Sequence, residues 1–218
     1  MVSFSSINKV VFAVGRLQPD GVQLLGTAFL LGKAGFFVTA AHVPAQNDQG
    51  LQIVFKNLTS LNDFQDTSDG QVQLLPVQIH ATDPFHDLAI LKADIDASSN
   101  IKIGNVAALD VGADVAVFGF PHADHGRVVL TQQNAEIGAR VLIQSGGIKA
   151  RHIVLNTQAR PGQSGSPVFS RLNGELIAIL VGSYAPGGGG GISLGGVDPH
   201  TLHQTTHAVS AEYIPKMI

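Results

Sequence analysis

The sequence predicts an all-β protein made of two six-stranded antiparallel β-barrels, followed by a short C-terminal helix. Three observations lead to this prediction. Short apolar segments bounded by Gly, Pro, Asn and Asp recur along the chain, as is typical of antiparallel strands. No long segment has the 3.6-residue hydrophobic period of a helix. The 218 residues are 44% hydrophobic and 13% charged, which suits one large β domain, or two small lobes, with a substantial core.

The predicted elements form two sets on either side of a break at residues 94–110. The first six candidate strands are residues 9–17, 26–32, 36–40, 51–56, 72–80 and 87–93. The other seven candidates are residues 114–120, 127–132, 139–144, 152–158, 166–170, 175–182 and 206–210. We therefore expect an N-terminal barrel over residues 1–105 and a C-terminal barrel over residues 106–218, which together make one domain. The predicted helix spans residues 210–218, with Ser210 as N-cap, although Pro215 disfavours its regular continuation.

Composition excludes several classes of function. The net charge of −3 comes with no basic stripe, so we expect neither nucleic acid nor a membrane as partner. The absence of cysteine excludes disulfides, cysteine-ligated zinc and a cysteine nucleophile. The N-terminus lacks the features of a signal peptide, and no stretch approaches the ~18 apolar residues of a membrane span. We therefore expect a soluble, cytoplasmic protein, with a secreted mature form as the alternative.

Three polar residues stand at informative places in this strand pattern. His42 follows the predicted strand 36–40, Asp87 begins the predicted strand 87–93, and Ser164 lies in the glycine-rich stretch RPGQSGSPVF at 160–169. Each residue alone would usually be structural: a strand-end histidine, a capping carboxylate or a turn serine. Together they give the chain order His, Asp, Ser, one of the three orders in which a serine nucleophile, its base and its orienting acid are known.

The chemistry of acyl transfer explains these residue types. A serine hydroxyl is a weak nucleophile at neutral pH and needs a base within hydrogen-bond reach, which His42 would supply to Ser164. A carboxylate, here Asp87, would fix the imidazole tautomer. Backbone N–H groups must meet the developing oxyanion, and Gly162 and Ser164 are placed to provide them. The sequence therefore predicts the catalytic set His42, Asp87 and Ser164, with an oxyanion hole at Gly162 and Ser164.

The segments around these residues resemble those of trypsin-like serine proteases of the chymotrypsin fold. GTAFLLGKAGFFVTAAHV is similar to the family's segment that ends in the catalytic histidine, and HDLAIL to the segment around the aspartate. NTQARPGQSGSPVFSRLNGELIAIL resembles the nucleophile loop and the strand after it. VFGFPHADHGRVVLTQQ and HAVSAEYIPKMI are similar to segments of bacterial HtrA-type proteases, although no PDZ region follows. The resemblance implies a serine endopeptidase that forms an acyl-enzyme and acts on polypeptides, without a cofactor.

Two departures from the family pattern bear on activation and specificity. Gln163 replaces the aspartate that pairs with a newly cut N-terminus in digestive trypsins, so that activation switch is expected to be absent. SGSPVF is the variant seen in glutamyl endopeptidases, but Leu180 falls where their substrate-binding histidine would be. The resemblance implies a substrate site formed by two loop residues, by the edge of one strand and by a histidine in the last strand. It favours a small or apolar P1 residue. These residues are Gln158, Ala159, Val181, Gly182, Ser183 and His207.

Two alternatives stay open from sequence. The chain could be a latent or catalytically silent peptide-binding module of the same fold, activated by or acting with a regulatory protein partner. The glycine-rich loop 185–200 is interpreted as a surface loop beside the substrate pocket. The segments HADH at 122–125 and HTLHQTTH at 200–207 invite a metal site, but neither has a helical ligand frame, so we expect no metal.

Overall fold

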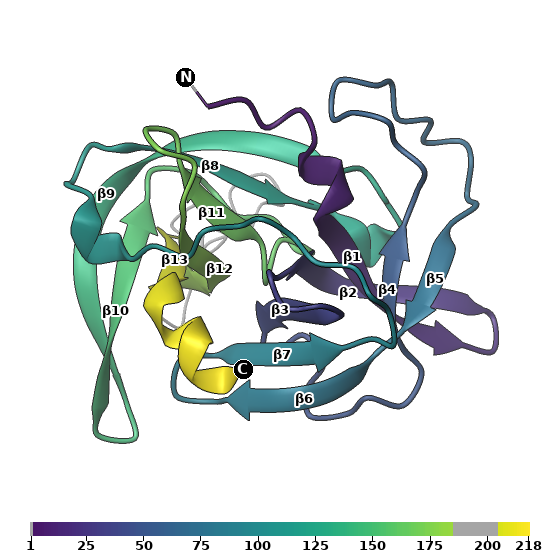
Figure 1. Cartoon of the computed structure of the whole chain (residues 1–218), viewed down its shortest axis with the longest axis horizontal. Helices are drawn as coiled ribbons and strands as arrows, with labels where there is room; N and C mark the ends of the chain where they lie inside the picture. Colours follow the sequence, from purple (N-terminus) through teal and green to yellow (C-terminus); the bar gives the residue numbers. More distant parts are fainter. Residues whose placement is uncertain (1, 185–204) are drawn as a thin grey trace, which may run out of the picture.

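The computed structural model describes residues 2–184 and 205–218, and within that part of the chain it contains thirteen strands in two sheets (Figure 1). The strands of the first sheet are β1 (Val11–Gln18), β2 (Gly21–Leu30), β3 (Phe36–Ala40), β4 (Leu51–Phe55), β5 (Gln73–Pro76), β6 (Gln78–Asp83) and β7 (Leu88–Lys92). Those of the second sheet are β8 (Asp114–Gly119), β9 (Thr131–Ser145), β10 (Ile148–Leu155), β11 (Pro167–Ser170), β12 (Leu176–Tyr184) and β13 (Thr205–Ser210). Four short 3₁₀ helices complete the described elements: η1 (Ile7–Lys9), η2 (Val106–Ala108), η3 (Ala123–His125) and η4 (Ala211–Met217).

The N-terminal sheet is a curled half-barrel of seven strands in the order β5-β4-β1-β2-β3-β7-β6. The sequence predicted six strands and a closed barrel here. The difference arises because the predicted strand 72–80 divides at Val77, whose buried N–H donates to Leu51 O over 3.1 Å. β5 and β6 are the two edges of the sheet, yet only Val77 separates them in the chain. The sheet must therefore curl until its edges come close together.

The C-terminal sheet is the closed barrel that the sequence predicted, with six strands in the order β10-β13-β12-β11-β8-β9. The expected strands 127–132 and 139–144 are replaced by one long strand, β9. The reversal comes later, at Gly146 and Gly147, whose φ angles of 54° and 84° are those of a two-residue hairpin turn. The far end of the β9–β10 hairpin extends past the barrel at the lower left of Figure 1.

Buried apolar side chains fill the interior of each curled sheet and also the space between the two sheets. Phe29 of β2, Phe118 of β8 and Phe169 of β11 belong to one buried cluster that spans both halves. A polar contact adds to this junction, because the Gln65 side chain donates to Leu130 O and accepts from Leu130 N, each over 2.8 Å. The two halves therefore share a core, and a site at their junction is held from both sides.

The C-terminal helix predicted at 210–218 is present as the 3₁₀ helix η4, which lies against β12 and β6 (yellow in Figure 1). Pro215 lies inside it and has no N–H to donate, which is compatible with a short helix of this type. The all-β, chymotrypsin-like fold class is thus confirmed, while the boundary between residues 105 and 106 stays a prediction. Among the described residues, no helix is both long and apolar enough to cross a membrane.

Candidate active site

The pairing of two strands brings His42 and Asp87 together. β3 ends at Ala40, which lies opposite Leu88, the first residue of β7. His42 therefore follows one strand at the place where Asp87 precedes the other. The His42 ring nitrogen Nδ1 lies 2.7 Å from Asp87 Oδ2, and the His42 backbone N–H donates to Asp87 Oδ1 over 3.0 Å. One carboxylate thus binds both the ring and the backbone of His42, and it leaves the ring's Nε2 for another partner.

The backbone at Asp87 is held in an unusual conformation. Its φ of 53° lies in the left-handed region, which short polar residues tolerate better than most. Ala41 N donates to Asp87 O over 3.0 Å and so ties this peptide to the histidine segment. The turn before it is closed by Asp83, whose Oδ1 accepts from the N–H groups of Phe85 and His86. The conformation that aims Asp87 at His42 is therefore built by its own loop.

His86 is a residue of this region that the sequence analysis missed. Its Nδ1 lies 2.6 Å from Asp83 Oδ2, and its ring stacks on Tyr213 of η4 with centroids 3.8 Å apart. The signal was present in the sequence, since His86 directly precedes Asp87 and follows Asp83 by three residues. What the sequence did not indicate was the contact with Tyr213, which lies 127 residues further along the chain and which only the fold brings to this loop.

Ser164 lies in the turn between β10 and β11, pressed against the N-terminal sheet. Its carbonyl accepts from Thr27 N over 2.8 Å, and the next N–H, of Gly165, donates to Leu180 O over 2.7 Å. A Cβ at Gly165 would lie 2.0 Å from Thr27 O and 3.1 Å from Ala40 N, so only glycine allows this approach. The turn therefore lies beside the end of β3. This strand ends at Ala40, two residues before His42.

The Ser164 side chain is partly exposed, and within residues 2–184 and 205–218 no hydrogen bond joins its hydroxyl to His42. Hydrogen bonds between a nucleophile and its base are often long or poorly aligned until substrate binds. The structure thus joins His42 to Asp87 and places the turn of Ser164 against the end of β3, with one of the two expected side-chain contacts formed.

The carbonyl and N–H groups around Ser164 differ in whether they have a hydrogen-bond partner. The carbonyl of Gly162 accepts from Thr27 Oγ1 over 2.9 Å, whereas the N–H groups of Gly162 and Ser164 donate to no acceptor in the described part of the chain. Gly162 has a φ of 90°, and a Cβ there would lie 2.4 Å from Phe120 O. This arrangement leaves two neighbouring donors available to an oxyanion.

The predicted substrate residues lie on two strands and one loop of the C-terminal barrel. β11 pairs with β12 only as far as Ile179, whereas β13 pairs with the other side of β12 as far as Tyr184. The backbone of residues 181–183, which includes Val181, Gly182 and Ser183, thus has no strand partner on the β11 side in the described residues. An extended peptide adds to an edge of this kind by strand pairing.

The loop before the nucleophile turn lies next to this edge. Ala159 N donates to Thr206 Oγ1 over 2.8 Å, and Gln158 O accepts from Gln133 Nε2 over 3.3 Å. His207 follows Thr206 in β13 and pairs with Gly182 of β12. Burial lowers the pKa of His207 below its usual value, so its ring is uncharged at neutral pH.

Neither histidine-rich segment provides a metal site in the described residues. His122 and His125 have ring centroids 6.4 Å apart, and no group of three or more potential ligands is found in residues 2–184 and 205–218. His200 and His203 lie outside the described residues, as does the whole of the glycine-rich loop 185–200. The absence of a metal therefore stays a prediction.

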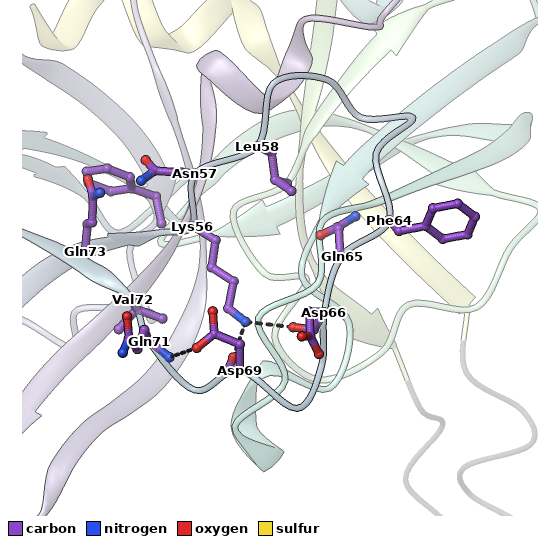
Figure 2. Close-up of a pocket in the computed structure, with 11 residues that line it drawn as sticks. Lys56, Asn57, Leu58, Phe64, Gln65, Asp66, Asp69, Gln71, Val72 and Gln73 are labelled. Atoms are coloured by element: carbon purple, nitrogen blue, oxygen red, sulfur yellow. Dashed lines mark hydrogen bonds between the residues drawn. The ribbon is translucent and has the colours of Figure 1, made fainter.

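A pocket away from this junction lies under the loop that joins β4 to β5 (Figure 2). It measures about 320 Å³ and contains none of His42, Asp87 and Ser164. Its one cationic group is Lys56, whose Nζ donates to the backbone carbonyls of Asp66 and Asp69. The loop thus occupies this ammonium with its own backbone, and the remaining charged groups of the lining are the carboxylates of Asp66 and Asp69.

An antiparallel half-barrel joined to a closed barrel, with a His–Asp pair at the junction and a glycine-bounded serine beside it, defines the class of trypsin-like peptidases. The chain belongs to this family: the model of the trypsin-like peptidase domain matches residues 26–179. A probable periplasmic serine endoprotease, DegP-like, of Pseudomonas fulva (strain 12-X) is 29% identical over 168 residues, which are 77% of this chain and 31% of that protein. The chain thus spans about a third of the length of this relative.

Solved structures agree with the fold. The HtrA-type protease AlgW with a tripeptide superposes with a TM-score of 0.65 at 20% identity, over 95% of this chain and 58% of AlgW. The MamO protease domain from Magnetospirillum magneticum, in its apo form, gives a TM-score of 0.70 at 16% identity, over 99% of both chains. The resemblance to HtrA-type protease domains that the sequence predicted is confirmed.

Proposed function

We propose that the chain is a serine endopeptidase that cleaves polypeptides through an acyl-enzyme. The observation that carries this proposal is the binding of both Asp87 carboxylate oxygens to His42, one at the ring and one at the backbone. Membership of the trypsin-like peptidase family supports it. A carboxylate on Nδ1 places the ring's proton there and leaves Nε2 as the acceptor that a general base needs.

In this mechanism Ser164 Oγ attacks the carbonyl carbon of the substrate while His42 Nε2 takes the hydroxyl proton. The oxyanion that forms accepts from Gly162 N and Ser164 N, the two donors without a protein acceptor in the described residues. His42 then gives its proton to the leaving amine. A water molecule repeats the sequence on the acyl-enzyme and releases Ser164. Asp87 stays ionised and stabilises the imidazolium in both halves of the reaction.

The substrate would bind as an extended strand along Val181, Gly182 and Ser183, whose outer side has no strand partner in the described residues. We propose a small or apolar P1 residue, in a pocket that includes Gln158, Ala159 and His207. Gln158 and Ala159 carry no charge, and burial keeps His207 neutral at pH 7. A P1 residue bearing either charge would thus meet no opposite charge from these side chains.

The names of the relatives bear on the compartment expected from sequence. The DegP-like relatives are named periplasmic, which leans against the cytoplasmic location expected from the N-terminal sequence. We propose that this chain acts in the same kind of compartment. The lack of cysteine is compatible with it, because no thiol is available for oxidation.

The alternative of a latent or silent peptide-binding module has less support. A binding module has no use for a carboxylate that orients a histidine beside a serine turn. Regulation by a protein partner stays a prediction, and its signature would be labelling that rises when the partner is added.

The test is covalent labelling of Ser164 by a fluorophosphonate. Ser164 Oγ forms a bond to phosphorus, fluoride leaves, and His42 takes the hydroxyl proton. We expect labelling of the unmodified chain and none of Ser164→Ala or His42→Ala. For Asp87→Asn we expect labelling slower by about 10⁴-fold, because the ring then takes the wrong tautomer.

Ser166→Ala is the matched control, since this second serine of the turn is fully buried and its hydroxyl has no hydrogen-bond partner in the described residues. Its labelling should equal that of the unmodified chain. If the folded, unmodified chain neither labels nor cleaves an unfolded protein substrate, the proposed activity is wrong and the peptide-binding alternative gains weight.

A further inference from the structure

The nucleophile turn contains a buried side chain that the mechanism above does not use. Gln163 lies between the two proposed oxyanion donors, Gly162 and Ser164, and is only 1% exposed. Its Oε1 accepts from Arg160 N over 2.7 Å, and its own N–H donates to Arg160 O over 3.1 Å. Gln163 therefore closes this turn twice, once through its backbone and once through its side chain.

The other end of the Gln163 carboxamide reaches the barrel wall. Its Nε2 donates to Gln133 Oε1 over 3.2 Å. Gln133 lies in β9, opposite Val117 of β8, so its backbone is fixed by the barrel. The Gln133 Nε2 donates to Thr157 Oγ1 and to Gln158 O. Two glutamine side chains thus join both ends of the loop 157–163 to a single strand.

A third anchor holds the beginning of the same loop. Thr206 of β13 is fully buried, and its Oγ1 donates to Thr157 O over 2.6 Å and accepts from Ala159 N over 2.8 Å. Because Thr206 fixes the beginning of the loop, the part of the loop whose orientation still has to be fixed is the peptide groups nearest Ser164. Thr27 bonds to two of those groups from β2, and the Gln163 side chain bonds to the start of the same turn at Arg160 N.

The carbonyl groups of the turn all have hydrogen-bond donors. Five consecutive carbonyls, of residues 160 to 164, each accept a hydrogen bond. Thr27 donates to two of them, to Gly162 O through Oγ1 and to Ser164 O through its backbone N–H. The other three bonds run from Gln163 N to Arg160 O, from His122 N to Pro161 O and from Ser166 N to Gln163 O. Fixing these carbonyls fixes the peptide planes. The N–H groups of Gly162 and Ser164 are then the donors left toward a substrate.

We propose that Gln163, acting through Arg160 N and Gln133, is a positioning residue that holds the oxyanion hole in its working form together with Thr27. This inference rests on the proposed function. Both glutamines are uncharged, so the turn needs no charged partner from a newly cut N-terminus. The pair would thus do by neutral hydrogen bonds what an ion pair does in digestive trypsins, and the hole would stay formed without an activation cleavage.

The experiment compares Gln163→Met, which keeps the side-chain length but loses both hydrogen bonds, with Gln163→Glu, which keeps only the acceptor for Arg160 N. The matched control is Gln132→Ala, because Gln132 is the exposed neighbour of Gln133 in β9. We expect Gln163→Met to lower kcat and the fluorophosphonate labelling rate by about 10- to 100-fold, with KM within twofold, since oxyanion donors act on the transition state. Gln163→Glu should also lose activity, because it places an unpaired carboxylate at this buried position against Gln133 Oε1, and Gln132→Ala should lose nothing.

Gln133→Ala tests the link to the barrel. It should lower kcat in the same way, and the double variant with Gln163→Met should lose less than the sum of the two single losses, because both changes break the bond between Gln163 and Gln133. Additive losses would contradict the coupling. Equal loss of kcat and of peptide affinity, the latter measured in a Ser164→Ala background, would mean that Gln163 has only a structural role.

Amide hydrogen exchange of the segment 160–166 separates this inference from the proposed activity. Gln163→Met should exchange faster there than the unmodified chain and Gln132→Ala, at unchanged exchange in the β8 and β11 strands. That result is expected even for a chain that does not label. Unchanged exchange in Gln163→Met would overturn the positioning role, whatever the activity measurements give.

Discussion

Thr27 shows how one residue can hold a site from the opposite sheet. Its Oγ1 donates to Gly162 O over 2.9 Å and accepts from Phe120 N over 3.2 Å. Its backbone N–H donates to Ser164 O, and its carbonyl accepts from Thr39 Oγ1. Thr27 is fully buried, so none of these groups has water as a substitute. The nucleophile turn is therefore fixed to β2 by a single threonine.

We predict that Thr27→Val, which keeps the shape of the side chain, lowers both stability and labelling of Ser164. The change leaves Phe120 N and Gly162 O buried without this partner, at a cost of about 1–3 kcal/mol for each group. Urea unfolding measures the free energy, and fluorophosphonate labelling measures the site. Thr27→Ser keeps the hydroxyl and should lose much less. Equal labelling in Thr27→Val and the unmodified chain would show that the turn holds without this contact.

The residues of the site differ in how far the sequence could predict them. His42 and Asp87 follow from the ends of two apolar strands, and Ser164 from the glycines around it. Thr27 could not be predicted, because its partner Gly162 is 135 residues away and nothing local distinguishes this threonine from any other strand residue. The proposed nucleophile, base and acid can be recognised from the residues next to them in the sequence. The residues that hold them in place are determined by tertiary contacts.

At the scale of elements, η4 connects the C-terminal barrel to the loop that carries Asp87. Tyr213 of η4 stacks on His86, with ring planes 26° apart. The Tyr213 hydroxyl accepts from the backbone N–H of Arg151 in β10 over 2.9 Å. The guanidinium of Arg151 also forms an ion pair with Glu212, with 3.2 Å between Nη1 and Oε2. The short helix therefore fastens the Asp83–Asp87 turn to the other sheet.

Tyr213→Ala should loosen this turn, and with it the aim of Asp87. We expect labelling of Ser164 to slow by about tenfold, a loss typical of misplaced positioning groups, together with a lower melting temperature. Tyr213→Phe keeps the ring stack and loses only the hydroxyl, so its labelling should stay near that of the unmodified chain. If the two variants label equally slowly, the hydroxyl rather than the stack supports the turn.

Strand boundaries show where element-level prediction fails. The sequence predicted two strands, 127–132 and 139–144, but in the structure the single strand β9 (Thr131–Ser145) continues through Gly138. A Cβ at this position would lie 2.2 Å from Asn156 Oδ1, so Gly138 permits a close approach between neighbouring segments and does not make a turn. The true turn, at Gly146 and Gly147, has the glycine pair that hairpins require. A glycine that permits a close approach and a glycine that forms a turn are therefore distinguished only by the residues that lie next to them in the folded protein.

For the whole molecule, the sequence predicted the all-β class and the two-part arrangement, because each half has its own run of apolar strands. It did not predict that one half closes and the other stays a curled sheet. Closure depends on which edges pair, and β5 and β6 each pair on only one side within the described residues. That outcome depends on long-range register, for which an apolar pattern carries little information.

The whole fold should also lose stability as the pH falls below about 6.5, through its buried histidines. Burial lowers the pKa of His152 and of His207, so below the ordinary histidine pKa of 6.5 the unfolded chain binds protons that the folded chain does not. The free energy of unfolding should therefore be fully present above pH 6.5. It should fall as the pH drops through 6.5, by at most about 1.4 kcal/mol per pH unit for each histidine.

Urea unfolding from pH 7.5 to pH 5 measures this slope, and His152→Gln isolates one contribution. His152 is 6% exposed, and its Nδ1 lies 3.2 Å from Ala150 O, a bond that a glutamine amide can replace. We expect the variant to lose less stability than the unmodified chain over the same pH range, because a glutamine takes up no proton. Parallel pH profiles for the two proteins would mean that His152 protonates equally well in the folded and unfolded chains, and that burial does not control its charge.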